Sequence, residues 1–189
     1  SLSGQAIWLG DSGSRGAQLN EALASGKPMP LGTITIDASS LRDGLSITPG
    51  EGTRSLYFYP GDEVLIRGLT FASSGQRQRP VVGNAGSLTL EDCVFSGNAA
   101  TDSGAALNND PRGHVVCRRC RFENNRSASR GGAIRNLGML EVEDCTFTGN
   151  EAPQGGALMQ ELGTATLTRC RFEGNAATGS GGAIALGGG

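Results

Sequence analysis

The segment Cys120-Arg-Phe122-Glu-Asn-Asn125, followed by Gly131-Gly-Ala-Ile134, is the clearest indication of the fold, because it is one of four similar copies in the second half of the chain. The phenylalanines of the four copies lie 27, 25 and 25 residues apart. A fixed period of this length is typical of a solenoid, in which each repeat packs only against its neighbours. The repeated positions are Cys93, Phe95, Asn98; Cys120, Phe122, Asn125; Cys145, Phe147, Asn150; and Cys170, Phe172, Asn175.

Each repeat contains three short strand candidates. Before Cys145, for example, Leu140 and Val142 alternate with Glu141 and Glu143, which predicts a strand with one face inside. The Cys-x-Phe pair predicts a second strand, and the Gly-Gly-Ala-Ile segment a third. A helical crossover of about 10 residues or more does not fit between them. The fold class is therefore all-β, a right-handed single-stranded parallel β-helix (solenoid).

The repeat weakens toward the N-terminus but remains recognisable. Strand candidates extend back to Thr33, so about six rungs reaching Ile184 would stand roughly 29 Å tall. Residues 1–30 differ, because residues 14–25 carry helical spacing before Gly26, and we expect an N-terminal cap with a short helix. Residues 31–189 form the predicted β-helix. The chain stops part way through a rung, so we expect a fragment truncated at its C-terminal end.

The repeated side chains are predicted to be structural. Stacked cysteines lie about one strand spacing of 4.8 Å apart, whereas a disulfide prefers Cβ atoms about 3.5–4.5 Å apart, so we expect a reduced internal ladder. The phenylalanines predict an internal stack. The asparagines are expected to turn the chain in left-handed backbone and to form a hydrogen-bonded ladder.

Composition limits the function classes. The net charge is −2, and 15 of the 16 basic residues are arginine. This balance gives no case for nucleic acid, and no apolar run reaches the roughly 18 residues of a membrane helix. Charges before the repeated cysteine alternate in sign from rung to rung, which favours one register. No phosphate-binding loop, catalytic triad or metal-spaced cluster is present, so we expect no cofactor and no metal.

One segment is strongly basic. Residues 111–135 hold seven arginines against the single acid Glu123, a local charge of +6. Acidic residues of adjacent rungs are expected to neutralise Arg118 and Arg119. Arg126 and Arg130 in the turn are then the free candidates for contact with a polyanion.

The paired motifs Phe-x-x-Asn and Gly-Gly-Ala-(Ile/Leu) resemble those of the chlamydial polymorphic membrane proteins, which are autotransporter-type surface adhesins. Three of the four tetrapeptides match, and Gly104-Ala-Ala-Leu107 departs by one residue. Residues 31–186 also look like the wider family of secreted bacterial β-helix proteins. The resemblance implies adhesion to a host or neighbouring cell through a surface protein or glycan. It implies an extracellular or outer-membrane-associated location, with membrane attachment only through segments outside this chain.

The leading hypothesis is therefore a non-enzymatic, monomeric β-helix module that mediates adhesion or acts as a rigid spacer. The alternative is a polysaccharide-binding or polysaccharide-cleaving protein. Cleavage needs clustered carboxylates, whereas those here alternate with arginine, and the single histidine, His114, is expected to be an ordinary turn residue.

Overall fold

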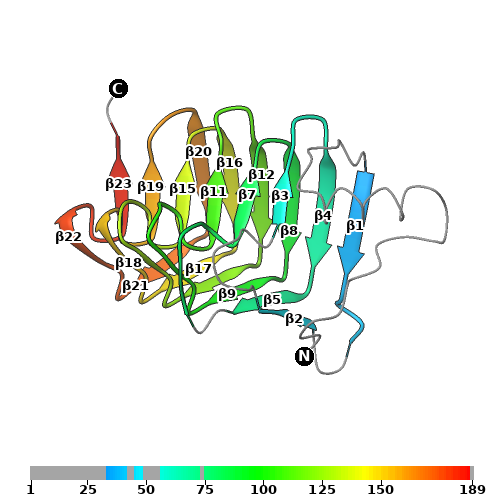
Figure 1. Ribbon diagram of the computed structural model, residues 1–189, viewed down its shortest axis with the longest axis horizontal. Helices are drawn as coiled ribbons and strands as arrows, with labels where there is room; N and C mark the ends of the chain where they lie inside the picture. Colours follow the sequence, from blue (N-terminus) through cyan, green and yellow to red (C-terminus); the bar gives the residue numbers. More distant parts are fainter. Residues whose placement is uncertain (1–32, 42–44, 49–55, 73–74, 188–189) are drawn as a thin grey trace.

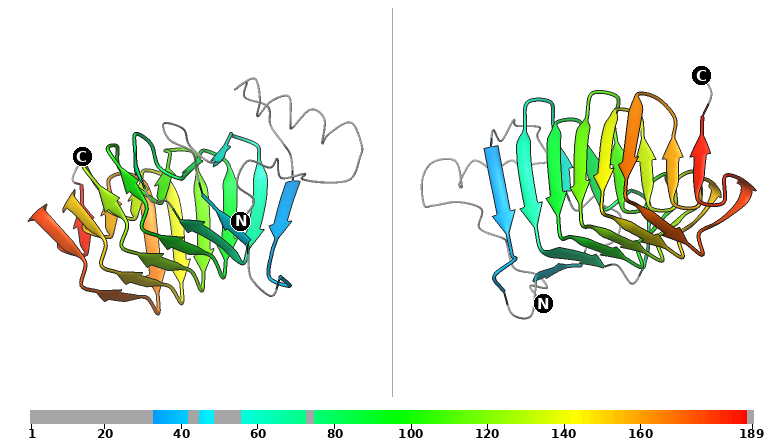
Figure 2. Two further views of the ribbon diagram at one scale, coloured as in Figure 1. Left: turned by 60° about the horizontal axis from the view of Figure 1, so that its bottom comes forward. Right: turned by 180° about the vertical axis from the view of Figure 1, so that it is seen from behind.

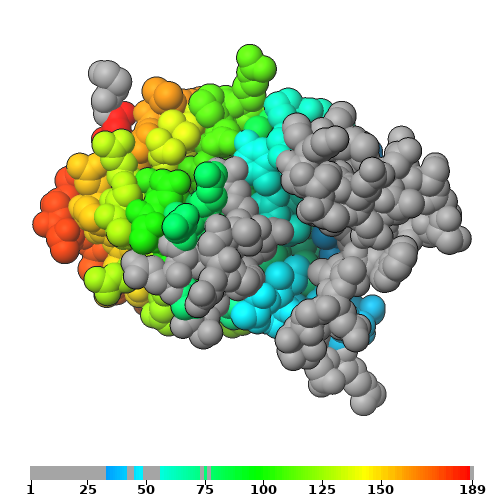
Figure 3. Space-filling view, in the orientation of Figure 1, coloured from blue at the N-terminus to red at the C-terminus, as the bar shows by residue number. Residues whose placement is uncertain are grey.

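The computed structural model describes residues 33–41, 45–48, 56–72 and 75–187. These residues form successive coils of a parallel β-helix whose axis runs along the length of the molecule (Figure 1). The predicted cap over residues 1–30 lies outside the described residues. The space-filling view shows the coils as bands of colour that follow one another from cyan to red (Figure 3).

Four parallel sheets form the sides of the helix, and coils two to six each contribute one strand to every sheet in the order A, B, D, C, while coil one contributes described strands to sheets A, B and C. Sheet A contains β1 (Thr33–Asp37), β4 (Glu63–Arg67), β8 (Ser87–Glu91), β12 (His114–Arg118), β16 (Met139–Glu143) and β20 (Thr164–Thr168). Sheet B contains β2 (Leu45–Ile47), β5 (Leu69–Ala72), β9 (Val94–Ser96), β13 (Arg121–Glu123), β17 (Thr146–Thr148) and β21 (Arg171–Glu173).

The other two sheets complete each coil. Sheet D contains β6 (Gln76–Arg77), β10 (Ala99–Ala100), β14 (Arg126–Ser127), β18 (Glu151–Gln154) and β22 (Ala176–Ser180). Sheet C contains β3 (Leu56–Phe58), β7 (Val82–Asn84), β11 (Leu107–Asn109), β15 (Ile134–Asn136), β19 (Leu158–Gln160) and β23 (Ile184–Leu186). Coil one therefore contains β1–β3, and coils two to six begin at β4, β8, β12, β16 and β20. Figure 2 shows this stacking from two further sides.

The number of strands per coil differs from the sequence-based prediction. We predicted three, and coils two to six have four, because sheet D follows each repeated asparagine. Three of the sheet D strands, β6, β10 and β14, are only two residues long, too short for a periodicity to reveal. The predicted third strand begins only at the last residue of the Gly-Gly-Ala-Ile segment, since the glycines form the corner before it.

A single apolar column fills the interior. Phe71, Phe95, Phe122, Phe147 and Phe172 stack face to face with ring centroids 4.7–5.0 Å apart. This distance equals the strand spacing of about 4.8 Å, so the predicted internal stack is confirmed. Aliphatic residues of sheets A and C pack around the rings. Within the described residues no helix occurs, and hence none is long and apolar enough to cross a membrane.

The corners use left-handed backbone, but not at the residues we expected. The repeated asparagines do not have positive φ. The residue before each of them does, as Gly97, Asn124, Gly149 and Gly174. A second left-handed corner precedes each repeated cysteine, at Asp92, Arg119, Asp144 and Arg169. The reason is geometric. The corner residue faces away from the core, and the side chain of the residue after it points into the core.

Candidate functional site

The repeated asparagines form a continuous amide ladder inside the coil. Asn98 donates from Nδ2 to Oδ1 of Asn125 at 2.9 Å, and Asn125 donates to Asn150 at 3.0 Å. Each Nδ2 also donates to the carbonyl of a phenylalanine in the coil before, such as Phe95 for Asn125 at 3.0 Å. Asn98, Asn125 and Asn150 are fully buried. They are placed to hold one coil on the next, and the ladder predicted from the repeat is observed.

Sequence reasoning missed a second amide ladder in sheet C. Asn84 donates to Asn109 at 3.0 Å, Asn109 to Asn136 at 2.7 Å, and Asn136 to Gln160 at 2.7 Å. The three asparagines are fully buried. The signal was present, because an amide residue lies two positions after three of the four Gly-Gly-Ala-Ile segments or variants, at Asn109, Asn136 and Gln160, whereas the last segment is followed by Leu186.

The repeated cysteines are free thiols with a common environment. Each Sγ contacts the carbonyl two residues before it and a carbonyl of the preceding coil, as Cys93 does with Glu91 at 3.3 Å and Ile66 at 3.5 Å. Cys93, Cys120 and Cys145 are buried, while Cys170 in coil six is half-buried. Hydrogen bonding to neighbouring thiols, first that of Cys117, together with burial, raises the pKa of Cys120.

The arginine-rich segment is neutralised by neighbouring coils more completely than we expected. Arg126 and Arg130 are not free. Arg126 pairs with Glu151 at 3.4 Å, and Arg130 pairs with Glu161 at 2.9 Å. These partners lie 25 and 31 residues later in the chain, so only the stacking of coils brings them to the arginines. The prediction that these two residues contact a polyanion assumed that their charges are unpaired, and both are paired.

A charge ladder follows the corner between sheets A and B. Arg67 bonds Glu91 at 2.7 Å, and Arg118 lies 3.3 Å from Glu91 and 3.7 Å from Glu143. The pKa of Glu91 lies below its usual value, first because of the hydrogen bond from Arg67. The corner pair Arg169 and Asp144 meets at 2.6 Å, and this contact lowers the pKa of Asp144.

A further polar network, which the sequence did not indicate, lies on sheet C. Tyr57 donates to Asp110 at 2.7 Å across the intervening coil, whose residue at this position is Gly83. Arg135 holds Glu161 through two hydrogen bonds of 3.0 and 2.6 Å. The side chain of Glu161 is only 12% exposed, and bonding to Arg135 lowers its pKa.

His114 pairs with a glutamate of the next coil. Its Nε2 lies 3.0 Å from the Glu141 carboxylate, and both side chains are about half exposed on sheet A. It lies in β12 rather than in the turn that we expected. Among the described residues, no group of three or more His, Cys, Asp or Glu side chains is arranged to hold a metal ion.

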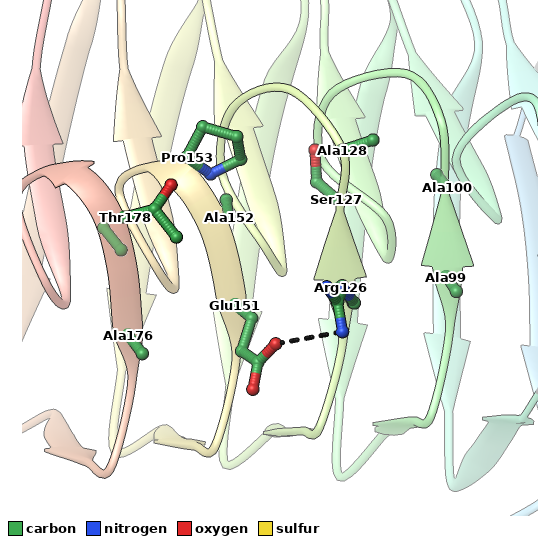
Figure 4. A pocket seen from close by; sticks show the side chains of 11 residues that line it. Ala99, Ala100, Arg126, Ser127, Ala128, Glu151, Ala152, Pro153, Ala176 and Thr178 are labelled. Atoms are coloured by element: carbon green, nitrogen blue, oxygen red, sulfur yellow. Dashed lines mark ion pairs between the residues drawn. The ribbon is translucent and has the colours of Figure 1, made fainter.

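A groove of about 790 Å³ runs along sheet D over coils three to six (Figure 4). Its lining is dominated by small residues, because alanine occupies many positions of the short sheet D strands. Arg126 and Glu151 face each other across two adjacent coils in the groove, and Pro153 and Thr178 lie along its other side. Among the described residues, the groove is therefore lined mainly by small side chains, carries one ion pair and contains no aromatic residue.

Comparison with known proteins agrees with this architecture. Residues 54–188, more than half of the chain, match the family described as the right handed beta helix region. No curated protein and no solved structure gives a significant match to the chain. The parallel coils and the extent of this match lead to one conclusion: the chain belongs to the right-handed β-helix family.

Proposed function

We propose that this β-helix is a non-catalytic module of a secreted or surface-displayed protein, serving as a rigid spacer or an adhesion element. The observation that carries the proposal is that its carboxylates pair with arginines of adjacent coils, as Glu91 does with Arg67, Asp92 with Arg119, Asp144 with Arg169 and Glu161 with Arg135. Every described carboxyl group whose pKa is shifted has a lowered pKa: Asp37, Glu91, Asp92, Asp144 and Glu161.

Acid catalysis of glycoside cleavage requires the opposite. A general acid that works near neutral pH needs a raised pKa, and its partner carboxylate must face the same substrate. Four of the five lowered groups owe the shift first to an arginine of an adjacent coil, and Asp37 owes it first to Ser39. These four carboxylates therefore help their arginine partners to hold adjacent coils in register.

Rigidity supports the spacer function. Two buried amide ladders and the phenylalanine stack connect successive coils, so bending between two coils would break several contacts at once. The resemblance of the Phe-x-x-Asn and Gly-Gly-Ala-Ile motifs to surface adhesins supports the location. Staining of intact cells of the source with an antibody to this chain tests the proposed surface location. Staining only after permeabilisation would contradict that location.

A second candidate is glycan binding, and the groove along sheet D favours it. Its volume lies within the range of about 300–1,000 Å³ that is usual for ligand sites. It extends over several coils, which suits an extended polymer more than a compact ligand.

One experiment separates these functions. The purified chain is incubated with neutral and acidic polysaccharides, and retention and chain length are followed by mass spectrometry. Cleavage would overturn the non-catalytic proposal. Retention that Arg126→Ala abolishes and Arg171→Ala preserves would assign binding to the groove, because Arg171 is a similarly exposed, ion-paired arginine on sheet B. No retention by the wild type would leave the spacer function.

A further inference from the structure

Coil four has a thiol on each side of its corner. Cys117 is the last residue of β12 whose side chain points into the core. Cys120 is the next residue to do so, directly after the left-handed corner residue Arg119. The corresponding pairs are Leu90 with Cys93 in coil three and Val142 with Cys145 in coil five. Coil four is thus the coil, among those described, in which both inward residues flanking this corner are cysteines.

The two side chains enter the same part of the core. Cys117 is fully buried and Cys120 is 1% exposed. The Sγ of Cys120 lies 3.4 Å from the carbonyl oxygen of Arg118, the residue after Cys117. It also lies 3.4 Å from the carbonyl of Leu90, which is the register partner of Cys117 in coil three. The Cys117 thiol is the neighbour that does most to raise the pKa of Cys120.

The neighbouring thiols of the ladder are poorer partners. Cys93 and Cys145 also raise the pKa of Cys120, and the Cys145 Sγ accepts a hydrogen bond from the Cys120 backbone N–H at 3.2 Å, but both belong to other coils. Equivalent residues of stacked parallel strands are separated by about 4.8 Å, which exceeds the Cβ separation of about 3.5–4.5 Å that a disulfide prefers. The corner within one coil is free of this constraint, because the backbone turns between the two cysteines.

We propose that Cys117 and Cys120 form a disulfide within coil four when the chain folds under oxidising conditions. The oxidant is a small disulfide such as glutathione disulfide. One cysteine thiolate attacks a sulfur of the oxidant, forms a mixed disulfide and releases one thiol. The second thiolate then displaces the other thiol. Two protein thiols lose two protons and two electrons, and the oxidant disulfide becomes two thiols.

Burial determines when the reaction takes place. In the folded chain both thiols are shielded from a dissolved oxidant, so the bond forms before coils three to five close around them. Once formed, it is shielded from reductants for the same reason. The proposal is independent of adhesion or spacer function.

The two arginines between the cysteines allow the disulfide to be tested directly. Trypsin cleaves after Arg118 and Arg119, so only a disulfide keeps Cys117 and Cys120 together in a digest. The full chain is denatured, reduced and refolded in glutathione redox buffer or in excess dithiothreitol. Free thiols are then alkylated under denaturing conditions, and the unreduced digest is analysed by mass spectrometry.

We expect peptide 113–118 joined to peptide 120–121 after oxidative refolding, with Cys93, Cys145 and Cys170 alkylated. In the dithiothreitol sample all five cysteines are alkylated. Cys117→Val, which introduces the residue of coil five, abolishes the joined peptide, and Cys145→Ala retains it. Alkylation of all five cysteines in oxidatively refolded chains with a β-sheet circular dichroism spectrum would overturn the proposal. A disulfide from Cys120 to Cys93 or Cys145 would overturn the proposal as well. The wild-type digest alone distinguishes these outcomes, so the test does not depend on the folding of a variant.

Discussion

Arg119 and Asp92 occupy the same left-handed corner of consecutive coils, and the guanidinium of Arg119 holds the Asp92 carboxylate through two hydrogen bonds of 2.8 and 2.9 Å. Opposite charges in this position favour the observed register, because a slip by one coil would place like charges side by side. We expect Arg119→Asp to lower the denaturation midpoint more than Arg119→Ala does. The double exchange Asp92→Arg with Arg119→Asp should recover part of the loss. A double exchange that is as unstable as Arg119→Asp would contradict a role in pairing.

The centre of the phenylalanine stack should be its most sensitive part. Phe122 is fully buried between two rings, so Phe122→Ala should cost about 3–5 kcal/mol of unfolding free energy. Phe172→Ala in coil six serves as the matched control, because this ring is only partly buried and stacks against a single described ring. Urea denaturation measures both, and equal losses would argue against the stack as a continuous core.

Substitutions of two adjacent asparagines should differ strongly in their effect on stability. Asn125 is fully buried and bonds Asn98, Asn150 and the Phe95 carbonyl, so Asn125→Ala should cost about 3 kcal/mol or more by leaving buried groups unpaired. Asn124 is exposed at φ 53°, and three other coils have glycine at this position. Asn124→Gly should therefore change stability by less than about 0.5 kcal/mol. A large loss in both variants would contradict this division.

Stability should fall in acid. The folded-state pKa values of Glu91, Asp92 and Glu161 are lowered, so their contribution is present above the unfolded values of about 4.3 for Glu and 3.9 for Asp. It is lost as the pH falls through the lower folded-state values. We expect an almost constant denaturation midpoint from about pH 5 to 7 and a decline below about pH 4. Glu91→Gln should make this decline shallower, and an unchanged pH profile would exclude Glu91 as a main contributor.

The corner before sheet C should require glycine. Gly131 has φ 62°, and a Cβ there would lie 2.1 Å from the carbonyl oxygen of Ile134. The left-handed backbone alone costs a residue with a Cβ about 1–2 kcal/mol, and the clash adds to this. Gly131→Ala should thus lower the thermal midpoint by several degrees. Gly75→Ala, where the added Cβ has no atom of the described residues within 4 Å apart from its chain neighbours, should leave it unchanged.

Much of the interior was predictable because the repeat is local and regular. Phe122, Asn125 and Cys120 recur at nearly constant spacing, and stacking with a constant strand separation then requires each of them to meet its own equivalents. The two-residue strand Arg126–Ser127 was not predictable, because such a strand shows no periodicity. The left-handed backbone was assigned one residue too late, since the inward Asn125 follows the corner rather than forming it.

The repeat was sufficient to predict the coil: its length, its apolar column, one amide ladder and the alternation of charge from one rung to the next. These features depend on which residues recur at one spacing. The pairing of the surface charges became visible only in the stacked coils. Glu123, the acidic residue nearest to Arg126 and Arg130 in the chain, pairs with Arg121 instead, and Glu151 and Glu161 reach the two arginines from the next coil. The physical reason is that a solenoid places residues about 25 positions apart within hydrogen-bonding distance, and the direction of each long side chain then selects its partner.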